Sequence, residues 1–242
     1  MQIIPANNLE AAGLRAGTAT RLARELAAKP AFEIASFCAA AAVEVFGLPS
    51  KTHFFTAGQI HSDAISNSDA AELPAAGAAH KLPDCDALIS TRAGTALAIR
   101  TADCLPILFF EPQQQIIAAV HAGWRGIANE IAAKTVQKII KLGGDPKRIL
   151  AWVGPSIGSC CFDVQSDLAT KFQTAVSQRD GKQFVDLKKI ARGHLLDSGL
   201  QAKNISWTDH CTCCEPDLFA SHRREGAART NVQWSIIALP GG

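Results

Sequence analysis

Two histidines and one cysteine stand beside apolar segments of the chain. His61 follows a short apolar segment in the run GQIHSD, Cys104 lies between two apolar runs in RTADCLP, and His121 ends the apolar run in AAVHAGWRG. Two imidazoles and one thiolate form the ligand set of a catalytic zinc ion that keeps its fourth position open. Because the chain has seven histidines and eight cysteines, the residue types alone leave this trio as one hypothesis among several.

Two charged residues lie beside this trio. Gly123 and Gly126 flank Arg125 and predict a turn into a helix, whose first N–H groups could hold a phosphate together with that arginine. A glycine turn with a surface arginine is the alternative interpretation. Asp103, directly before Cys104, could orient a metal ligand or move a proton. The candidate catalytic residues are therefore Cys104, His121, Asp103 and Arg125.

A second group of soft ligands lies in the run HCTCC, residues 210–214. A structural zinc normally uses two separated ligand pairs, and the only other pair in the chain is the adjacent Cys160 and Cys161. We therefore interpret this run as packing rather than as a metal site. Buried packing is also what we expect of Cys38, Cys85 and Cys161, since free cysteine is among the most buried residue types.

The run SHRREGAART places Arg223, Arg224 and Arg229 near glycine. It could form a phosphate-binding edge, although a solvated basic turn is the interpretation that the residues alone favour. The phosphate loop GxxxxGK(S/T) and a strand-linked GxGxxG are both absent from the sequence. This absence argues against nucleoside triphosphates and dinucleotides as substrates.

Short strands and helices must position these residues. Alternating or continuous apolar runs predict strands at 53–55, with Ile60 as further strand material, and at 87–89, 96–99, 107–110, 116–120, 149–153 and 232–239. Helical spacings predict helices over 31–46, 127–140, 168–176 and 190–200, and the polar stretch 62–79 predicts a loop. Strands and helices do not alternate regularly, so we expect an α+β fold, with a mixed β-sheet core flanked by helices, and not a Rossmann sheet. No composition shift divides the chain, and we expect residues 1–242 to form a single domain.

Composition narrows the function classes. The formal net charge of +2 comes from 24 basic and 22 acidic residues mixed along the chain, so no polybasic stretch offers a nucleic-acid footprint. No apolar run approaches about 18 residues, and the first residues lack a signal-peptide pattern. Eight cysteines in 242 residues are too sparse for a disulfide scaffold. We expect a cytoplasmic protein that binds small molecules and neither nucleic acid nor membrane.

Six motifs together resemble those of the YfiH or laccase-domain family, and they occur in the family's order. They are QIHSD, DALIS, RTADCLPIL, AAVHAGWRG, GPSIGSCCF, and a late CT followed by SHRREG. The combination of VHAGWRG with TADCLP is highly specific. The resemblance implies a CNF1/YfiH-like fold and a zinc ion held by His61, Cys104 and His121.

The resemblance also implies an activity. Members were first labelled polyphenol oxidases and are regarded as purine nucleoside phosphorylases that also deaminate adenosine. The expected reaction is phosphorolysis of adenosine, inosine, guanosine or methylthioadenosine to the base and ribose 1-phosphate. Phosphate would be held by Arg125 with the substrate-binding residues Arg223 and Arg224, and the same zinc could activate water for deamination. This chain departs from the family over residues 12–32 and at His222, where the family has tyrosine.

Three alternatives stay open. The first is a copper-dependent, laccase-like polyphenol oxidase, although none of the seven histidines forms a His-x-His pair. The second is a cysteine hydrolase in which Cys104 is the nucleophile and His121 its base. The third is a zinc-stabilised binding module without catalysis.

Overall fold

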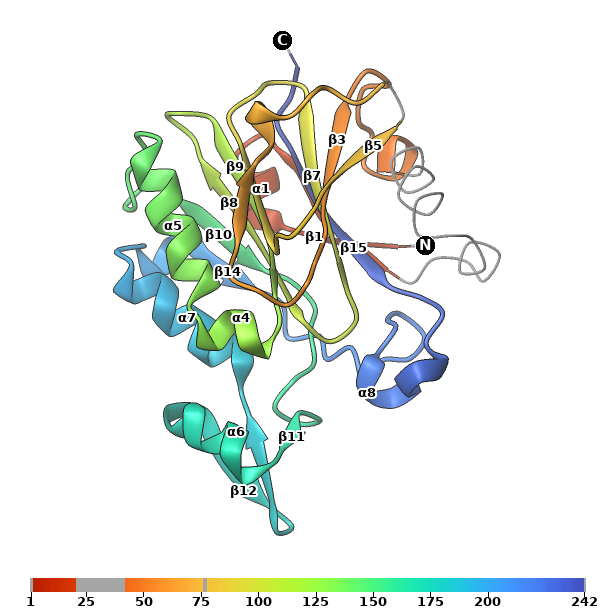
Figure 1. Ribbon diagram of the computed structural model, residues 1–242, viewed down its shortest axis with the longest axis vertical. Helices are drawn as coiled ribbons and strands as arrows, with labels where there is room; N and C mark the ends of the chain where they lie inside the picture. The colour runs from red at the N-terminus through yellow and green to blue at the C-terminus, as the bar shows by residue number, and fades with distance from the viewer. Residues whose placement is uncertain (1, 21–41, 76–77, 242) are drawn as a thin grey trace.

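Two six-stranded β-sheets pack face to face and form the body of the protein (Figure 1). The structure is a computed structural model that describes residues 2–20, 42–75 and 78–241. The first sheet has the order β1 (Ile3–Pro5), β2 (Arg15–Ala19), β15 (Gln233–Ala238), β7 (Thr95–Thr101), β3 (His53–Ala57) and β5 (Ala79–Leu82). The second has the order β14 (Ile205–Trp207), β10 (Leu150–Val153), β8 (Leu105–Glu111), β9 (Ile116–Ala122), β6 (Ala87–Ser90) and β4 (Ile65–Asn67). A small third sheet contains β11 (Asp163–Val164), β13 (Lys182–Val185) and β12 (Val176–Arg179).

Both large sheets combine parallel and antiparallel pairs. β3 pairs in parallel with β5 and β7, and the second sheet has parallel pairs at both edges, β10 with β14 and β4 with β6. The central pair of the second sheet, β8 with β9, is antiparallel, and its register sets Pro106 opposite His121. The start of β8, directly after Cys104, therefore lies beside the end of β9.

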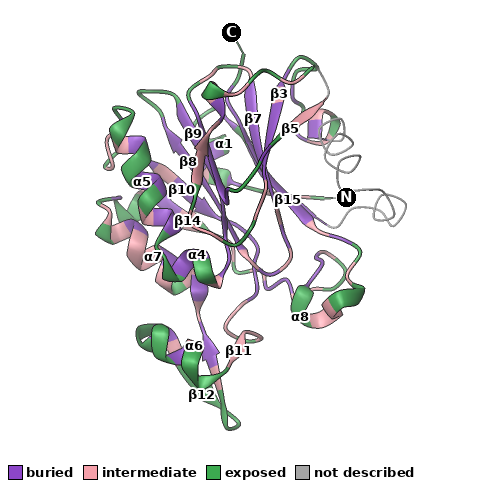
Figure 2. Cartoon of the chain, in the orientation of Figure 1, coloured by how far each residue is buried: buried purple, intermediate pink, exposed green. Residues whose placement is uncertain are grey.

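Helices cover the outer face of the second sheet. They are α4 (Trp124–Ala128), α5 (Ile131–Lys141) and α7 (Leu187–Asp197). α5 buries Ile131, Val136 and Ile139, which share one face at helical spacing, and its last turn carries lysines that complement the helix dipole. Figure 2 shows the central strands almost wholly buried, whereas α5 and α7 expose residues on their outer sides. Further helices are α1 (Asn7–Glu10), α6 (Ser166–Lys171), α8 (His222–Glu225) and the 3-10 turns Ser68–Ala70, Gln173–Ala175, Ala202–Asn204 and Gly226–Ala228.

Strand β9 shows why the predicted strands are continuous apolar runs. Ile116, Ala118 and Val120 pack in the cluster under the helices, whereas Ile117 and Ala119 pack in the cluster between the two sheets. Because successive side chains of a strand point to opposite faces, a strand covered on both sides needs apolar residues at every position.

The structure confirms the α+β class with mixed sheets. The runs predicted as strands at 87–89, 96–99, 107–110, 116–120 and 149–153 lie within β6, β7, β8, β9 and β10 except for Ile149, and the run 232–239 contains β15. The runs predicted as helices at 168–176 and 190–200 overlap α6 with the following 3-10 turn, and α7. None of the described helices is long and apolar enough to cross a membrane.

Four local predictions were wrong or fall outside the described residues. Ile60 lies after β3 and is 56% exposed, so it is not strand material. The predicted loop 62–79 contains the short strand β4 and a 3-10 turn. The predicted helix 127–140 is broken because Glu130 adopts a left-handed backbone conformation that separates α4 from α5. Of the predicted helix 31–46, residues 31–41 lie outside the described part, and residues 42–45 are helical.

Candidate active site

Three elements bring His61, Cys104 and His121 together. His61 follows β3, Cys104 lies in the turn between β7 and β8, and His121 is the penultimate residue of β9. Their ligand atoms all lie within 4.8 Å of one another, and His61 Nε2 is 4.0 Å from Cys104 Sγ. A tetrahedral zinc ion with its usual bond lengths would hold such atoms roughly 3.6 Å apart. The arrangement therefore fits one shared ion after a small contraction.

The backbone at this site adopts unusual conformations. Gln59, His61 and Asp103 are not glycine, yet they have positive φ values of 62°, 61° and 88°. Such conformations are uncommon for residues with a side chain, and they cluster at sites where the surrounding structure enforces them. Here they turn the chain sharply just before two of the three candidate ligands.

Asp86 binds both histidines of the site, although we did not identify it from the sequence. Its carboxylate accepts hydrogen bonds from the backbone N–H groups of Ile60 at 3.2 Å, His61 at 3.0 Å and Ser62 at 2.6 Å. It also pairs with His121 Nδ1 at 2.7 Å and is fully buried. One carboxylate therefore fixes both histidines. The sequence does contain a signal for Asp86, because this residue begins the DALIS motif. It directly precedes β6, the neighbour of β9.

The pair of Asp86 with His121 determines which nitrogen is available. Since Nδ1 faces the carboxylate, Nε2 is the atom that can reach Cys104 or a metal ion. Burial opposes charge on Asp86, but hydrogen bonds from His121 and Ser62 lower its pKa to about 2. Burial likewise opposes charge on His121, but Asp86 and Cys104 raise the pKa of this histidine to about 9. A carboxylate behind a histidine is the usual support of a metal ligand.

The environment of Cys104 favours the thiolate. Burial alone would raise the pKa of its thiol, but hydrogen bonds with His121 and His61 lower that pKa to about 7. The thiolate is both the metal-binding and the nucleophilic form of cysteine. This geometry supports either a metal centre or a cysteine nucleophile.

Gly123 leaves room for the trio. A Cβ atom at this position would lie 3.0 Å from His61 Cδ2 and 3.3 Å from Cys104 Sγ. We expect Gly123→Ala to weaken zinc binding by about 10-fold, because two ligands must move apart. Gly193→Ala is the matched control, since its Cβ meets nothing within 4 Å and helix α7 continues through it. Zinc titration of both variants against a chromophoric chelator measures the effect, and equal affinities would contradict the prediction.

The trio opens on a cavity of about 540 Å³. This volume is in the range of sites that enclose a small organic ligand. Four arginines face it, whereas Asp103 is its only carboxylate among the lining residues, so it favours an anion. The arginines are Arg100, Arg125, Arg223 and Arg229. Apolar and aromatic side chains complete the wall, namely Trp124, Ile157, Phe162, Leu187 and Val232.

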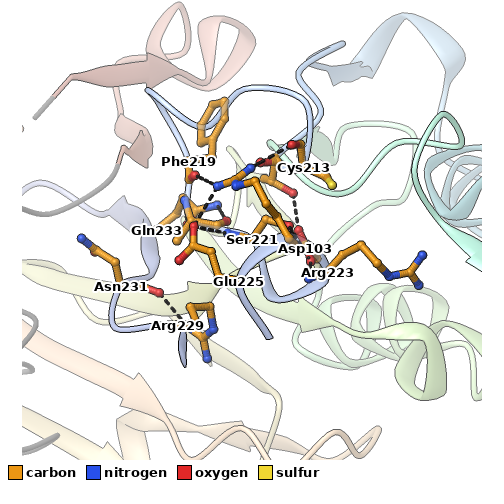
Figure 3. A network of polar contacts seen from close by, with 12 residues as sticks. Asp103, Cys213, Phe219, Ser221, Arg223, Glu225, Arg229, Asn231 and Gln233 are labelled. Atoms are coloured by element: carbon orange, nitrogen blue, oxygen red, sulfur yellow. Dashed lines mark hydrogen bonds and ion pairs between the residues drawn. The ribbon is translucent and has the colours of Figure 1, made fainter. Parts of the chain in front are cut away.

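The carboxylate of Asp103 lies in a network of polar contacts with residues 212–223 (Figure 3). One carboxylate oxygen accepts a hydrogen bond from Thr212 Oγ1 at 2.6 Å, and the other accepts from Ser221 Oγ at 3.0 Å and the N–H of Arg223 at 2.6 Å. The role of orienting a metal ligand, predicted for Asp103, belongs by geometry to Asp86. Asp103 instead connects residues 212–223 by hydrogen bonds to the turn that carries Cys104.

Arg224, which we predicted to bind substrate, is not among the residues that line the cavity. Its guanidinium donates to the carbonyl oxygens of Thr212, Cys213 and Phe219 at 2.6 to 2.8 Å and pairs with Glu225. These bonds engage both terminal nitrogens of the guanidinium within its own loop. Adjacent residues of a helix point in different directions, which agrees with Arg223 lining the cavity and Arg224 lying outside its lining.

Arg223 and Arg125 do face the cavity. The guanidinium of Arg223 also binds Asp163 and the carbonyl oxygen of Cys161, so it is partly committed. Arg125 is exposed and stacks on Trp124, with its guanidinium carbon 4.2 Å from the ring centroid. The helix that it was predicted to open, α4, has only five residues, so its dipole adds little to anion binding. Arg100 and Arg229 complete the set, and the sequence alone did not identify Arg100.

Comparison with known sequences identifies the family. Residues 36–240 match the sequence model of a family described as multi-copper polyphenol oxidoreductase laccase. The chain belongs to this laccase family. A purine nucleoside phosphorylase of Deinococcus radiodurans is 38% identical over 160 residues, which are 64% of this chain and 61% of that relative. Adenosine deaminase RL5, from an unidentified prokaryote, is 36% identical over 154 residues, which are 60% of this chain and 59% of that relative.

A solved member of the laccase family has the same fold. The crystal structure of the hypothetical protein YfiH from Bacillus licheniformis superposes with a TM-score of 0.86 at 26% sequence identity. The match covers 98% of this chain and 96% of that one. The resemblance to the YfiH family is thereby confirmed. The matches to the two curated relatives, however, span only about three fifths of each relative's length.

Proposed function

We propose that this chain is a zinc-dependent purine nucleoside phosphorylase with adenosine deaminase as a side activity. One observation carries the proposal: two histidines and a thiolate, supported by Asp86, open on a cavity that four arginines line. The names of the two relatives support both activities. Adenosine, inosine, guanosine and methylthioadenosine, each with phosphate, are the substrates that we propose.

The cavity has groups for both parts of such a substrate pair. In phosphorolysis, a phosphate oxygen forms a bond to C1′ of the ribose while the bond from C1′ to the purine nitrogen breaks. The purine leaves with the electron pair and takes up a proton. The arginines would hold phosphate and offset its charge, and Arg125 is exposed at the cavity. Trp124 and Phe162 offer aromatic surface on which a purine can stack.

We propose zinc rather than copper as the bound metal. His61, Cys104 and His121 line the cavity and would hold zinc with three ligands, which is the number that catalytic zinc takes from the protein. When bound, zinc supplies a Lewis acid that polarises a substrate oxygen or activates water. A blue-copper centre uses the same two histidines and cysteine but adds a weak axial ligand, most often methionine, and the only methionine of the chain is Met1. Stoichiometric copper in protein purified without added metal would overturn this preference.

Turnover of nucleosides tests the proposal. Purified protein with adenosine and phosphate should yield adenine and ribose 1-phosphate, and adenosine without phosphate should yield inosine at a lower rate. Chromatography of the bases and nucleosides measures both products. If zinc-loaded protein converts none of the four nucleosides, the proposed function is wrong. Because the free thiols of the site need a reducing compartment, we further propose that the protein acts in the cytoplasm.

Arg125→Gln should separate the two activities. The variant loses a charge-assisted contact to phosphate, so we expect the KM for phosphate to rise about 10-fold. Deamination uses no phosphate, and its rate should change by less than about twofold, which makes it an internal control for folding and zinc content. Equal losses in both reactions would contradict a phosphate-binding role for Arg125.

A cysteine hydrolase is the second candidate. The lowered pKa of Cys104 and its contact with His121 favour it as much as they favour a zinc ligand. The two differ in how zinc affects the thiol. Bound zinc should block alkylation of Cys104 under the phosphorylase proposal, whereas rapid labelling in the presence of excess zinc would favour the hydrolase.

A further inference from the structure

Four cysteines outside the candidate active site form a second cluster of soft ligands. The Sγ atoms of Cys160, Cys161, Cys211 and Cys214 all lie within 4.8 Å of one another. Cys214 Sγ is 3.5 Å from Cys160 Sγ and 3.3 Å from Cys161 Sγ. These separations are too long for a disulfide, and all four residues are free cysteines. A tetrahedral zinc with four thiolates at about 2.3 Å holds its sulfur atoms about 3.8 Å apart.

We propose that Cys160, Cys161, Cys211 and Cys214 bind a second zinc ion, which is structural. Four thiolates leave no open position, in contrast to the trio of the candidate active site. Cys211 and Cys214 have the C-x₂-C spacing of a zinc-binding pair. The packing role that we predicted for residues 210–214 and for Cys161 is therefore revised, because Cys161 is not buried and the two pairs meet only in the folded chain.

Backbone contacts hold the two pairs in place. The segment after β10 and the segment after β14 lie side by side, joined by a bridge between Ser156 and Cys211. The N–H of Thr212 donates to the carbonyl oxygen of Ser156 at 3.1 Å. The N–H of Gly158 donates to Cys211 Sγ at 3.2 Å, the type of contact that stabilises a thiolate ligand. A Cβ at Gly158 would lie 3.1 Å from Cys160 Sγ, so a side chain here would displace that sulfur atom by a few tenths of an ångström.

The four thiols influence one another's ionisation. Burial opposes ionisation of Cys211, but N–H groups that include that of Gly158 lower its pKa. Burial and the neighbouring sulfur atoms raise the pKa of Cys160 to about 11 and also raise the pKa of Cys161. Four thiolates this close repel one another unless a cation lies between them.

Three basic side chains donate hydrogen bonds to backbone carbonyl oxygens in the segments that carry the cluster. Arg179 donates to the carbonyl oxygen of Cys160 at 2.8 Å, and Arg223 donates to that of Cys161 at 2.8 Å. Lys188 donates to the carbonyl oxygens of Thr208 and His210. A zinc ion with four thiolates carries a net charge of about −2, which these cations offset.

The second zinc would stabilise the wall of the active-site cavity. The two segments that it joins carry Ile157, Phe162 and Arg223, which line that cavity. The inference rests on the four cysteines alone and does not depend on nucleoside chemistry.

Cobalt exchange in the unaltered protein gives the first test. Protein purified without oxidant and loaded with Co²⁺ should show the intense charge-transfer absorption of a centre with four thiolates, in addition to the weaker absorption of the single-thiolate trio. A spectrum of one thiolate only would overturn the proposal, as would a disulfide among the four cysteines by mass spectrometry. If the purified protein contains iron and acid-labile sulfide, the four cysteines bind an iron–sulfur cluster and not zinc, which would also overturn the proposal.

Metal counts in variants give the second test. We expect about two zinc ions per chain in the unaltered protein and about one in the double variant Cys211→Ser, Cys214→Ser. Cys213→Ser is the matched control, because its thiol lies in the same run but outside the cluster, and it should keep both ions. His61→Ala should lose the other ion and keep this one. A double variant with the same zinc content as the control would overturn the proposal.

Discussion

Asp86→Asn should weaken zinc binding at the trio by about 100-fold and reduce nucleoside turnover in the same proportion. The carboxylate accepts from three consecutive backbone N–H groups and pairs with His121 Nδ1, so it fixes both histidines at once. An asparagine of the same shape would point an N–H₂ group at donors that need an acceptor. We also expect the free energy of unfolding to fall by roughly 3 kcal/mol, since a buried pair loses one charged partner.

Asp84→Asn is the matched control for this substitution. Asp84 is exposed and has a φ of 50°, a conformation that asparagine tolerates well. Zinc titration and urea unfolding of both variants measure the two effects. If Asp86→Asn binds zinc as tightly as Asp84→Asn, then Asp86 does not position the ligands, and the trio is not held in the way that we describe.

Cys104→Ser should reduce phosphorolysis and deamination together by at least about 100-fold. A hydroxyl stays protonated at neutral pH, whereas the hydrogen bonds from His121 and His61 bring the pKa of Cys104 to about 7. Serine has nearly the same shape, so the turn between β7 and β8 should persist. The variant should therefore fold, retain phosphate binding at the arginines and fail to hold zinc at the trio.

Cys213→Ser serves as the control for Cys104→Ser as well. Steady-state rates with adenosine, with and without phosphate, measure both activities, and circular dichroism verifies the fold. Retention of either activity above about a tenth of the unaltered rate would show that the thiolate is dispensable for that reaction. That outcome would remove the link between the proposed metal centre and the proposed function.

The sequence determined the strands at the centre of the fold, because each is covered on both faces. β8 and β9 are apolar over most of their length, and this leaves a nearly continuous signal in the sequence pattern. The sequence did not predict which strands share a sheet. β6, β8 and β9 lie in one sheet and β7 in the other, although all four follow one another along the chain. Such pairing depends on long-range packing that local patterns do not record.

The sequence likewise provided His61, Cys104 and His121, since their residue types and motif context point to metal chemistry before any contact is known. Only the tertiary structure decided what supports and surrounds them. Asp86 and Arg100 serve the site through contacts with segments distant in the chain. The spacing of residues along the chain can indicate metal ligands that lie within one motif. The four-cysteine cluster forms only because two segments some fifty residues apart meet in the folded chain. The sequence thus specified the reactive groups, and the folded chain decided which of them meet, because only tertiary packing fixes distances between remote residues.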